Sequence, residues 1–190
     1  NKIIINIFNI AIIILAFLAH ILFVGIFSVL SLKPLVIYNI FSVCFYIFTY
    51  LLTKLKRYRS LVILVHLEIC LYVVVSTYFL GWNFGFPLFL IALASMVYFC
   101  PFKNKMIPYL FSIVEIIIFM VLKIYTLYNE PIYHYSDFTV SGFYIFNSAA
   151  TFTLMIYGAF ISNLSVAMTQ QTLTQNNSVL QDMVNHDTLT

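Results

Sequence analysis

Long apolar stretches follow one another along the whole chain, and they constrain the fold more than any other feature of the sequence. The first stretch runs from Ile3 to about Leu30 without a charged residue. A helix needs about 20 apolar residues to cross the roughly 30 Å hydrocarbon core of a bilayer. Only 8% of the 190 residues are charged, against about a quarter in an ordinary soluble domain. The sequence therefore excludes a soluble globule and predicts a membrane protein.

Charged residues and Pro or Gly turn signals divide these stretches into six predicted transmembrane helices. Their expected ranges are 3–30, 35–53, 60–80, 86–100, 106–128 and 142–166. A β-barrel would instead need strands of about ten residues with alternating polar and apolar side chains. The run from Ile10 to Leu18 has no such alternation. We therefore expect an all-α membrane protein in which residues 1–166 form a six-helix transmembrane module.

The basic residues are distributed unevenly about this predicted topology. The side that holds both termini also holds seven of the nine basic residues: Lys2, Lys54, Lys56, Arg57, Arg59, Lys103 and Lys105. Membrane proteins keep an excess of Lys and Arg in their cytoplasmic loops. We therefore expect both termini to be cytoplasmic and the helices to contact membrane lipids. The net charge of +3, without a basic face, excludes a nucleic-acid partner.

Common motifs of enzymes and of metal sites are missing from the sequence. It contains no GxxxxGK[ST] nucleotide loop, no GxSxG nucleophile turn and no HExxH zinc motif. Cys44, Cys70 and Cys100 lie far apart inside apolar stretches, which is typical of packing residues and not of a metal knuckle or a disulfide framework. We predict no catalytic residue, no metal and no cofactor within these 190 residues.

After about Val166 the composition changes from apolar to polar without a Pro or Gly. Val166, Leu173 and Leu180 recur at intervals of seven residues, which is the spacing of a coiled-coil seam. We interpret residues 167–185 as a helical linker that continues the sixth span and pairs with a second copy in a parallel homodimer. A solvated helix of a monomer stays an equal alternative, because two or three heptads with polar core positions are marginally stable.

The last residues carry a resemblance to a known family. His186, Asp187, Leu189 and Thr190 match the His-Asp-x-Leu-Thr opening of the GGDEF domain of membrane-bound diguanylate cyclases. The match covers only the tail, and the Gly-Leu-x-Asn-Arg continuation lies beyond the last residue. Since the chain also lacks an initiator Met, we expect it to be a piece of a longer protein, with residues 186–190 the first of a truncated GGDEF-like domain.

This resemblance implies a function for the whole protein. The membrane part would be a sensor in a bacterial cytoplasmic membrane that regulates synthesis of cyclic di-GMP. GTP and Mg²⁺ would bind only beyond Thr190, and joining two GTP molecules requires two facing cyclase domains, hence a homodimer. A histidine kinase is the nearest competitor, but its phosphoacceptor motif is similar to His-Glu-Leu-Arg-x-Pro, and Asp187 and Thr188 follow His186 here. The competing class is a small six-helix transporter or channel with a cytoplasmic tail.

Ionisable residues inside the predicted spans are candidate functional groups, because each is costly to bury in a membrane. At 1.5 Å per residue, His66 and Glu68 lie about 9–12 Å from the cytoplasmic ends of their span, and Glu115 lies about 13 Å deep. Residues 66 and 68 are about 200° apart around a helix, so they cannot line one cavity directly. We expect Glu115 to pair with one of them, either as a proton-linked switch or as a structural hydrogen bond between helices.

A second polar layer is predicted nearer the outer face. It contains His20, Lys123, Tyr144, Asn147 and Thr151, from the first, fifth and sixth spans. We expect these residues to line a pocket for a small amphipathic ligand with an anionic head, since two of them can be cationic. Interfacial anchoring, with the Lys123 side chain extended toward the membrane surface, explains the same residues as well.

Overall fold

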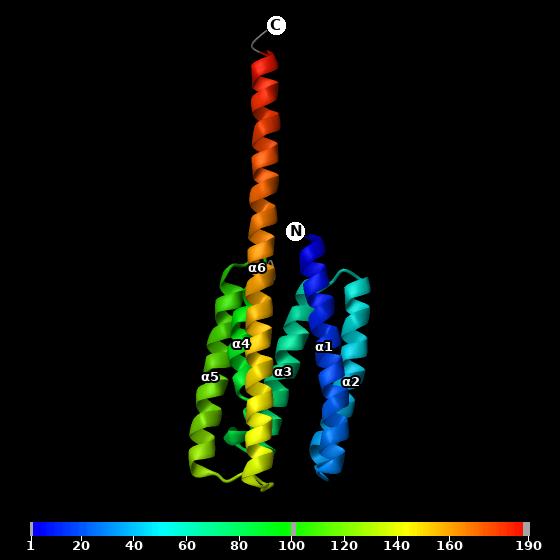
Figure 1. The fold of residues 1–190 in the computed structure, drawn as a ribbon, viewed down its shortest axis with the longest axis vertical. Helices are drawn as coiled ribbons and strands as arrows, with labels where there is room; N and C mark the ends of the chain where they lie inside the picture. The colour runs from blue at the N-terminus through cyan, green and yellow to red at the C-terminus, as the bar shows by residue number, and fades with distance from the viewer. Residues whose placement is uncertain (1, 100–101, 188–190) are drawn as a thin grey trace.

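The computed structural model describes residues 2–99 and 102–187, with the side chains of residues 10–98 and 102–184. Every regular element within these ranges is a helix (Figure 1). In chain order they are α1 (Lys2–Val29), α2 (Lys33–Lys54), α3 (Tyr58–Leu80), the 3₁₀ turn η1 (Trp82–Phe84), α4 (Leu88–Met96), the 3₁₀ turn η2 (Val97–Phe99), α5 (Met106–Tyr128) and α6 (Asp137–Asp187). The expected all-α fold is confirmed.

Five of the described helices are long and apolar enough to cross a membrane, as expected of a membrane protein. These candidate spans are Ile10–Val29, Lys33–Lys54, Tyr58–Leu80, Met106–Tyr128 and Asp137–Val184. The predicted span 86–100 differs, because its α-helix α4 has only nine residues. With the three residues of η2 it reaches about 20 Å, short of the roughly 30 Å hydrocarbon core.

Two glycines and a proline explain why this segment is short. Gly81 ends α3 with a φ of +83°, and Gly85 ends η1 with a φ of +80°, conformations that residues with a Cβ rarely adopt. Pro87 then begins α4. The turn is buried, since Phe84 and Phe86 are 2% and 0% exposed. Residues 81–87 thus form a mostly apolar plug in place of the first turns of a straight span, and Asn83 is its one exposed residue.

The helices form a bundle around the central α3. α1 packs along α2, while α4 lies against both α5 and α6 (Figure 1). Near the α1–α2 turn, the bundle is closed by an aromatic cluster built around Phe23, Phe27 and Phe86. Toward the opposite end, Ile13 and Leu61 belong to a second cluster between α1, α2 and α3. The polar residues of the candidate site lie between these two apolar clusters.

The last helix, α6, is uninterrupted over 51 residues, which corresponds to about 77 Å. It starts at Asp137, earlier than the predicted 142, and includes the predicted span as well as the predicted linker. Its first half packs against α4 and η1, and its second half projects from the bundle (Figure 1). Every described side chain from Val166 to Val184 is exposed.

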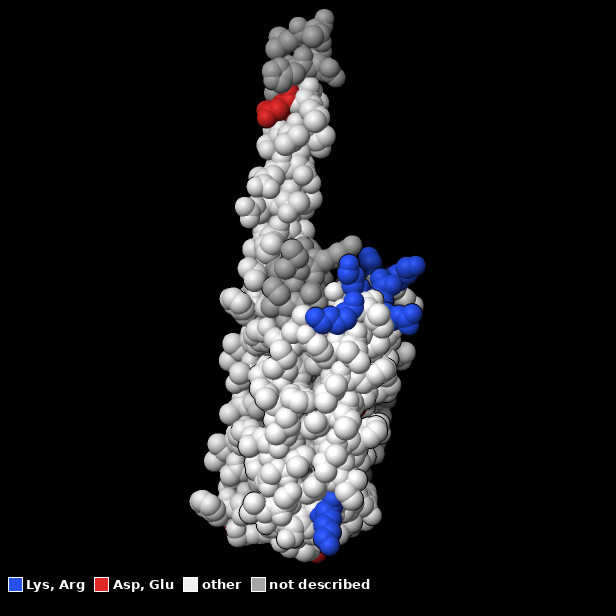
Figure 2. Space-filling view, turned by 90° about the vertical axis from the view of Figure 1, so that its right-hand side faces the viewer, with Lys and Arg blue, Asp and Glu red and all other residues white. Residues whose placement is uncertain are grey.

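Lys and Arg side chains gather at the end of the bundle from which α6 projects (Figure 2). The described ones come from the α2–α3 turn and from the segment before α5: Lys54, Lys56, Arg57, Arg59, Lys103 and Lys105. Lys33, at the start of α2, lies at the opposite end. The positive charge of the bundle is therefore concentrated at one end.

The described cysteines differ in their surroundings. Cys70 on α3 is partly buried, whereas Cys44 on α2 is exposed. Cys44 does not pack inside the bundle as expected, because the buried face of α2 is occupied by Asn39, Ser42 and Tyr46. Cys100 lies outside the described residues.

Candidate functional site

The buried face of α2 carries a stripe of polar side chains. Asn39, Ser42 and Tyr46 recur at steps of three and four residues, so they share one face of the helix. They are at most 1% exposed, and Thr49 and Thr53 continue the stripe. A polar group buried in an apolar surrounding is costly unless it is hydrogen-bonded. The stripe therefore needs polar partners on the neighbouring helices.

Glu68 of α3 is the main partner of this stripe. The Ser42 hydroxyl donates to its Oε1 at 2.5 Å, and the Tyr46 hydroxyl donates to its Oε2 at 2.8 Å. The side chain of Glu68 is 3% exposed. Hydrogen bonds to an ionised carboxylate are about twice as strong as those between neutral groups. The two hydroxyl groups therefore stabilise Glu68 as an acceptor within the bundle.

His20 of α1 completes this cluster. Its Nδ1 lies 2.7 Å from Oδ1 of Asn39, and Nδ2 of Asn39 donates to the carbonyl of Leu35 at 2.7 Å. Because Oδ1 of Asn39 can only accept, Nδ1 of His20 carries the proton. The other ring nitrogen, Nε2, lies 3.7 Å from Oε1 of Glu68. Three helices thus meet at one histidine–carboxylate pair.

The sequence separated His20 and Glu68 into two layers, and this prediction is wrong. Counting from Ile3 placed His20 deeper than it lies, because α1 extends past the adjacent end of α2 (Figure 1). α1 begins at Lys2, eighteen residues before His20, whereas α3 begins at Tyr58, ten residues before Glu68. The 3.7 Å between Nε2 of His20 and Oε1 of Glu68 nevertheless puts both residues in one layer of the bundle.

A second histidine–carboxylate pair joins α3 to α5. Nε2 of His66 lies 3.8 Å from Oε1 of Glu115, and Nδ1 of His66 donates to the carbonyl of Val62 at 2.8 Å. Neither oxygen of Glu115 accepts a hydrogen bond from a described residue, although Glu115 is only 1% exposed. His66 and Glu68 point to different helices, as their 200° separation around α3 predicts. Glu115 therefore has His66 as its nearest polar partner among the described residues, whereas Glu68 has two hydroxyl donors besides His20.

A cavity of about 330 Å³ lies beside both pairs, and both histidines line it. Its wall is built from α1, α3, α4 and α6, with Tyr46 contributed by α2. Apart from these two histidines, the lining consists mainly of aliphatic and aromatic side chains. A volume of 300 Å³ or more is in the range of small-molecule sites. This cavity could not be predicted from the sequence, because its volume depends on the distances between the packed helices.

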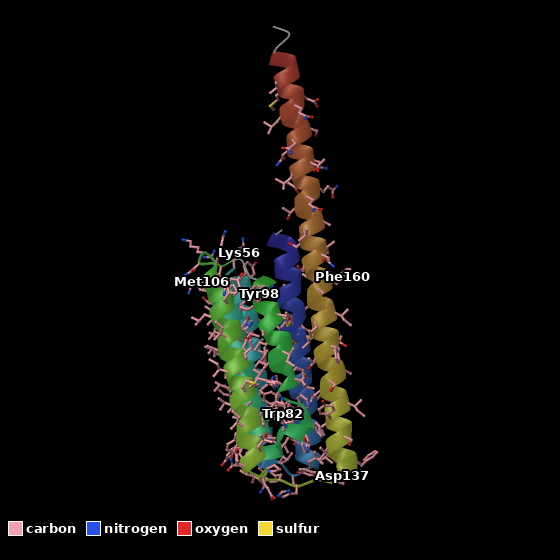
Figure 3. All side chains as sticks on the ribbon, turned by 90° about the vertical axis from the view of Figure 1, so that its left-hand side faces the viewer. Lys56, Trp82, Tyr98, Met106, Asp137 and Phe160 are labelled. Carbon is pink, nitrogen blue, oxygen red and sulfur yellow. The ribbon has the colours of Figure 1, made fainter. Side chains whose placement is uncertain are left out.

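Of the five residues of the predicted outer pocket, only His20 lines this cavity. Nζ of Lys123 lies 4.8 Å from the ring centroid of Trp82, which lies toward the Asp137 end of the bundle (Figure 3). Nδ2 of Asn147 donates to the carbonyl of Phe84 at 2.8 Å, so this amide fixes the buried turn. Thr151 is buried, and Tyr144 is 44% exposed. The plug at 81–87 packs closely on two of these residues, since a Cβ at Gly85 would lie 3.3 Å from Cα of Tyr144 and 3.4 Å from Cβ of Asn147.

The remaining predicted residues belong to the projecting part of α6. Val166, Leu173 and Leu180 are 53%, 58% and 58% exposed. The side chains of His186 and Asp187, and the whole of Leu189 and Thr190, lie outside the described residues. In the part that is described, no three His, Cys, Asp or Glu side chains are grouped to hold a metal ion.

The chemistry open to this site is the exchange of a proton within each pair. A buried carboxylate beside an imidazole can share one proton without net charge, either as an ion pair or as a neutral acid and base. The position of that proton changes the hydrogen bonds between helices. Since both histidines also line the cavity, its contents and the two pairs can influence each other.

No protein-family model, no curated protein and no solved structure matches the chain. The geometry of the chain and the motif at its end are therefore the indications of its function.

Proposed function

We propose that the chain is a membrane sensory and dimerisation module that regulates a C-terminal diguanylate cyclase through α6. The observation that carries the proposal is the continuity of α6. Phe146, Ala150 and Leu154 of this helix line the cavity, and the same helix leads to the His-Asp-x-Leu-Thr sequence. A shift or rotation of α6 at the cavity would therefore be transmitted along one rigid element.

The distribution of charge supports a cytoplasmic position for the projecting end of α6. The basic residues at that end of the bundle follow the bias of cytoplasmic loops. A nucleotide cyclase also needs cytoplasmic GTP. We therefore place both termini in the cytoplasm and the α1–α2 turn on the opposite face, in a bacterial inner membrane.

The exposed apolar side chains of α6 support a dimer. Val166, Leu173 and Leu180 lie in one row along the projecting part of α6, where every described side chain is exposed. A parallel partner helix would bury this row, and each fully buried Leu contributes about 1.5–3 kcal/mol of hydrophobic stabilisation. The resulting coiled coil would hold two cyclase domains face to face.

A small transporter or channel is the second candidate. The two buried histidine–carboxylate pairs favour it, because ionisable groups inside a membrane often belong to proton relays. The short α4 with its Gly and Pro boundary also resembles the interrupted helices of transporters. It does not account for the long exposed helix or for the motif at residues 186–190.

The test is cyclase activity of the full-length protein in membrane vesicles supplied with GTP and Mg²⁺. Leu173→Asp places a charge in the proposed seam, and Ser178→Asp places the same charge on the opposite face of the exposed helix. We expect Leu173→Asp to reduce cyclic di-GMP production at least tenfold and Ser178→Asp to leave it within twofold. Absence of any cyclase activity, or equal effects of the two substitutions, would contradict the proposal.

A further inference from the structure

Three of the polar side chains that line the cavity already use a polar atom in a hydrogen bond within the protein. The Tyr46 hydroxyl donates to Glu68, and Nδ1 of His20 donates to Asn39. The Thr153 hydroxyl donates at 2.8 Å to a carbonyl of its own helix. These residues therefore contribute mainly ring carbons and methyl groups to the cavity wall. Nε2 of His66 and the hydroxyl of Tyr72 are the buried polar atoms of lining residues that have no hydrogen-bond partner among the described residues. A ligand therefore finds mostly apolar contacts and few hydrogen-bonding groups.

The charges around the cavity disfavour an anion. No Lys or Arg lines it in the described part of the chain. The carboxylates of Glu68 and Glu115 lie directly beyond the two lining histidines, at 3.7 Å and 3.8 Å from their ring nitrogens. Charges interact strongly in a medium of low dielectric constant. The anionic head that we expected from Lys123 and His20 together is therefore excluded from this cavity.

The cavity is bounded on one side by side chains that face the lipid. Leu15 of α1 is 52% exposed and Phe146 of α6 is 46% exposed, yet both line the cavity. Both belong to candidate membrane spans. A molecule dissolved in the hydrocarbon region can therefore enter between α1 and α6 without crossing a polar surface.

The size and the wall of the cavity indicate the kind of molecule. An apolar cavity of about 150 Å³ holds one benzene ring, so about 330 Å³ corresponds to roughly two rings. Aromatic side chains from five positions surround the space: Phe23, Tyr46, Tyr72, Phe89 and Phe146. Aromatic rings pack edge-to-face or offset-stacked, which favours a flat partner over a flexible chain.

We infer that this cavity binds a neutral aromatic molecule of about two fused rings that reaches it from the membrane. The inference rests on the proposed function only in treating this molecule as the signal, because binding itself does not depend on a cyclase. Occupation of the cavity would press on Ala150 and Leu154 and so bias the position of α6. A phospholipid acyl chain offers similar apolar surface but is neither flat nor rigid.

Photolabelling in phosphatidylcholine vesicles tests this inference directly. The probe is a neutral naphthalene that carries a diazirine, and labelled peptides are located by mass spectrometry. We expect labels to concentrate on the α1 and α6 segments that line the cavity. Excess 2-methylnaphthalene should reduce them at least tenfold, whereas 2-naphthoate, which has the same rings and a negative charge, should not. Labels spread evenly over lipid-facing residues and unaffected by 2-methylnaphthalene would mean that lipid alone occupies the space and would overturn the inference.

Adjacent alanines on α6 provide a matched pair of variants. Ala150 lines the cavity, and Ala149 is exposed and does not. Ala150→Phe should abolish the competed labelling, and Ala149→Phe should preserve it. Ala16→Phe fills the cavity from α1 and serves if Ala150→Phe does not fold. Competition that survives both filling substitutions would refute the assignment, whether or not the full-length protein proves to be a cyclase.

Discussion

Replacing His66 by Leu removes the nearest partner of the Glu115 carboxylate and keeps an apolar side chain at that position of α3. Glu115 would then have neither a counter-charge nor a hydrogen bond among the described residues, because its oxygens accept none. Removing one partner of a buried ion pair typically costs about 3–5 kcal/mol of folding stability. We expect His66→Leu to lower the free energy of unfolding by an amount in this range.

Two further variants separate this effect from a loss of packing. In the double variant His66→Leu/Glu115→Leu no charge is left in the interface, so the loss should fall to about 1 kcal/mol or less. His20→Leu should cost about 2 kcal/mol, less than His66→Leu, because Glu68 keeps the hydroxyl groups of Ser42 and Tyr46. His134→Leu, at an exposed position between α5 and α6, serves as the control, with a change within about 0.5 kcal/mol.

The assay is equilibrium unfolding in mixed micelles, followed by the fluorescence of Trp82. This residue is the single tryptophan of the chain and packs at 4.9 Å from the ring of Phe119. The reasoning fails if His66→Leu costs no more than His134→Leu. It also fails if the double variant loses the sum of the two single losses, since independent residues would then explain the data without an interaction between them.

Other predictions concern the buried turn and the outer end of the bundle. Gly85→Ala places a Cβ 3.2 Å from the Tyr144 ring at a φ of +80°, so it should lower the unfolding free energy by about 1–2 kcal/mol in the same titration, whereas Gly25→Ala, which meets no neighbour within 4 Å, should not lower it. Asn147→Leu leaves the carbonyl of Phe84 without its donor and should cost about 1–3 kcal/mol, and an unchanged midpoint would refute that role. Lys123→Met removes the cation from the Trp82 ring and should change its emission spectrum while costing at most about 1 kcal/mol, and an identical spectrum would contradict the contact.

Hydropathy predicted the long helices well, because charges and turn residues mark their ends. The range 106–128 agrees with α5 at both ends, and 60–80 differs from α3 only at its start. Hydropathy was least accurate at 86–100, where the structure has the nine-residue α4 and the 3₁₀ turn η2, and Pro87 lies just inside the predicted start. Hydropathy cannot distinguish a buried apolar turn such as Phe84 to Phe86 from the start of a span, since both lack polar residues.

The candidate site was only partly predictable. His66, Glu68 and Glu115 were found because ionisable residues are rare in apolar helices. Asn39, Ser42 and Tyr46 were missed, although their spacing of three and four residues could have revealed a polar face on α2. The partnership of His20 with Glu68 depends on how far α1 extends relative to α3. That offset is set by packing between helices and not by the residues of either helix alone.

The central claim is that α6 transmits the state of the cavity as one rigid helix. The most direct test is to rotate the part of α6 that leads to the C-terminus relative to the part that lines the cavity. One to seven alanines are inserted in the exposed part of α6, in the segment between Thr169 and Thr172. Each inserted residue rotates the C-terminal part of the helix by about 100° relative to the bundle. Seven residues return the rotation to within about 20° of the start. The measurement is cyclic di-GMP production by the full-length protein in vesicles for each insertion. We expect activity to change at least fivefold with two insertions and to return near its original level with seven. Activity that is the same for every insertion, or that only declines with length, would contradict a helical relay.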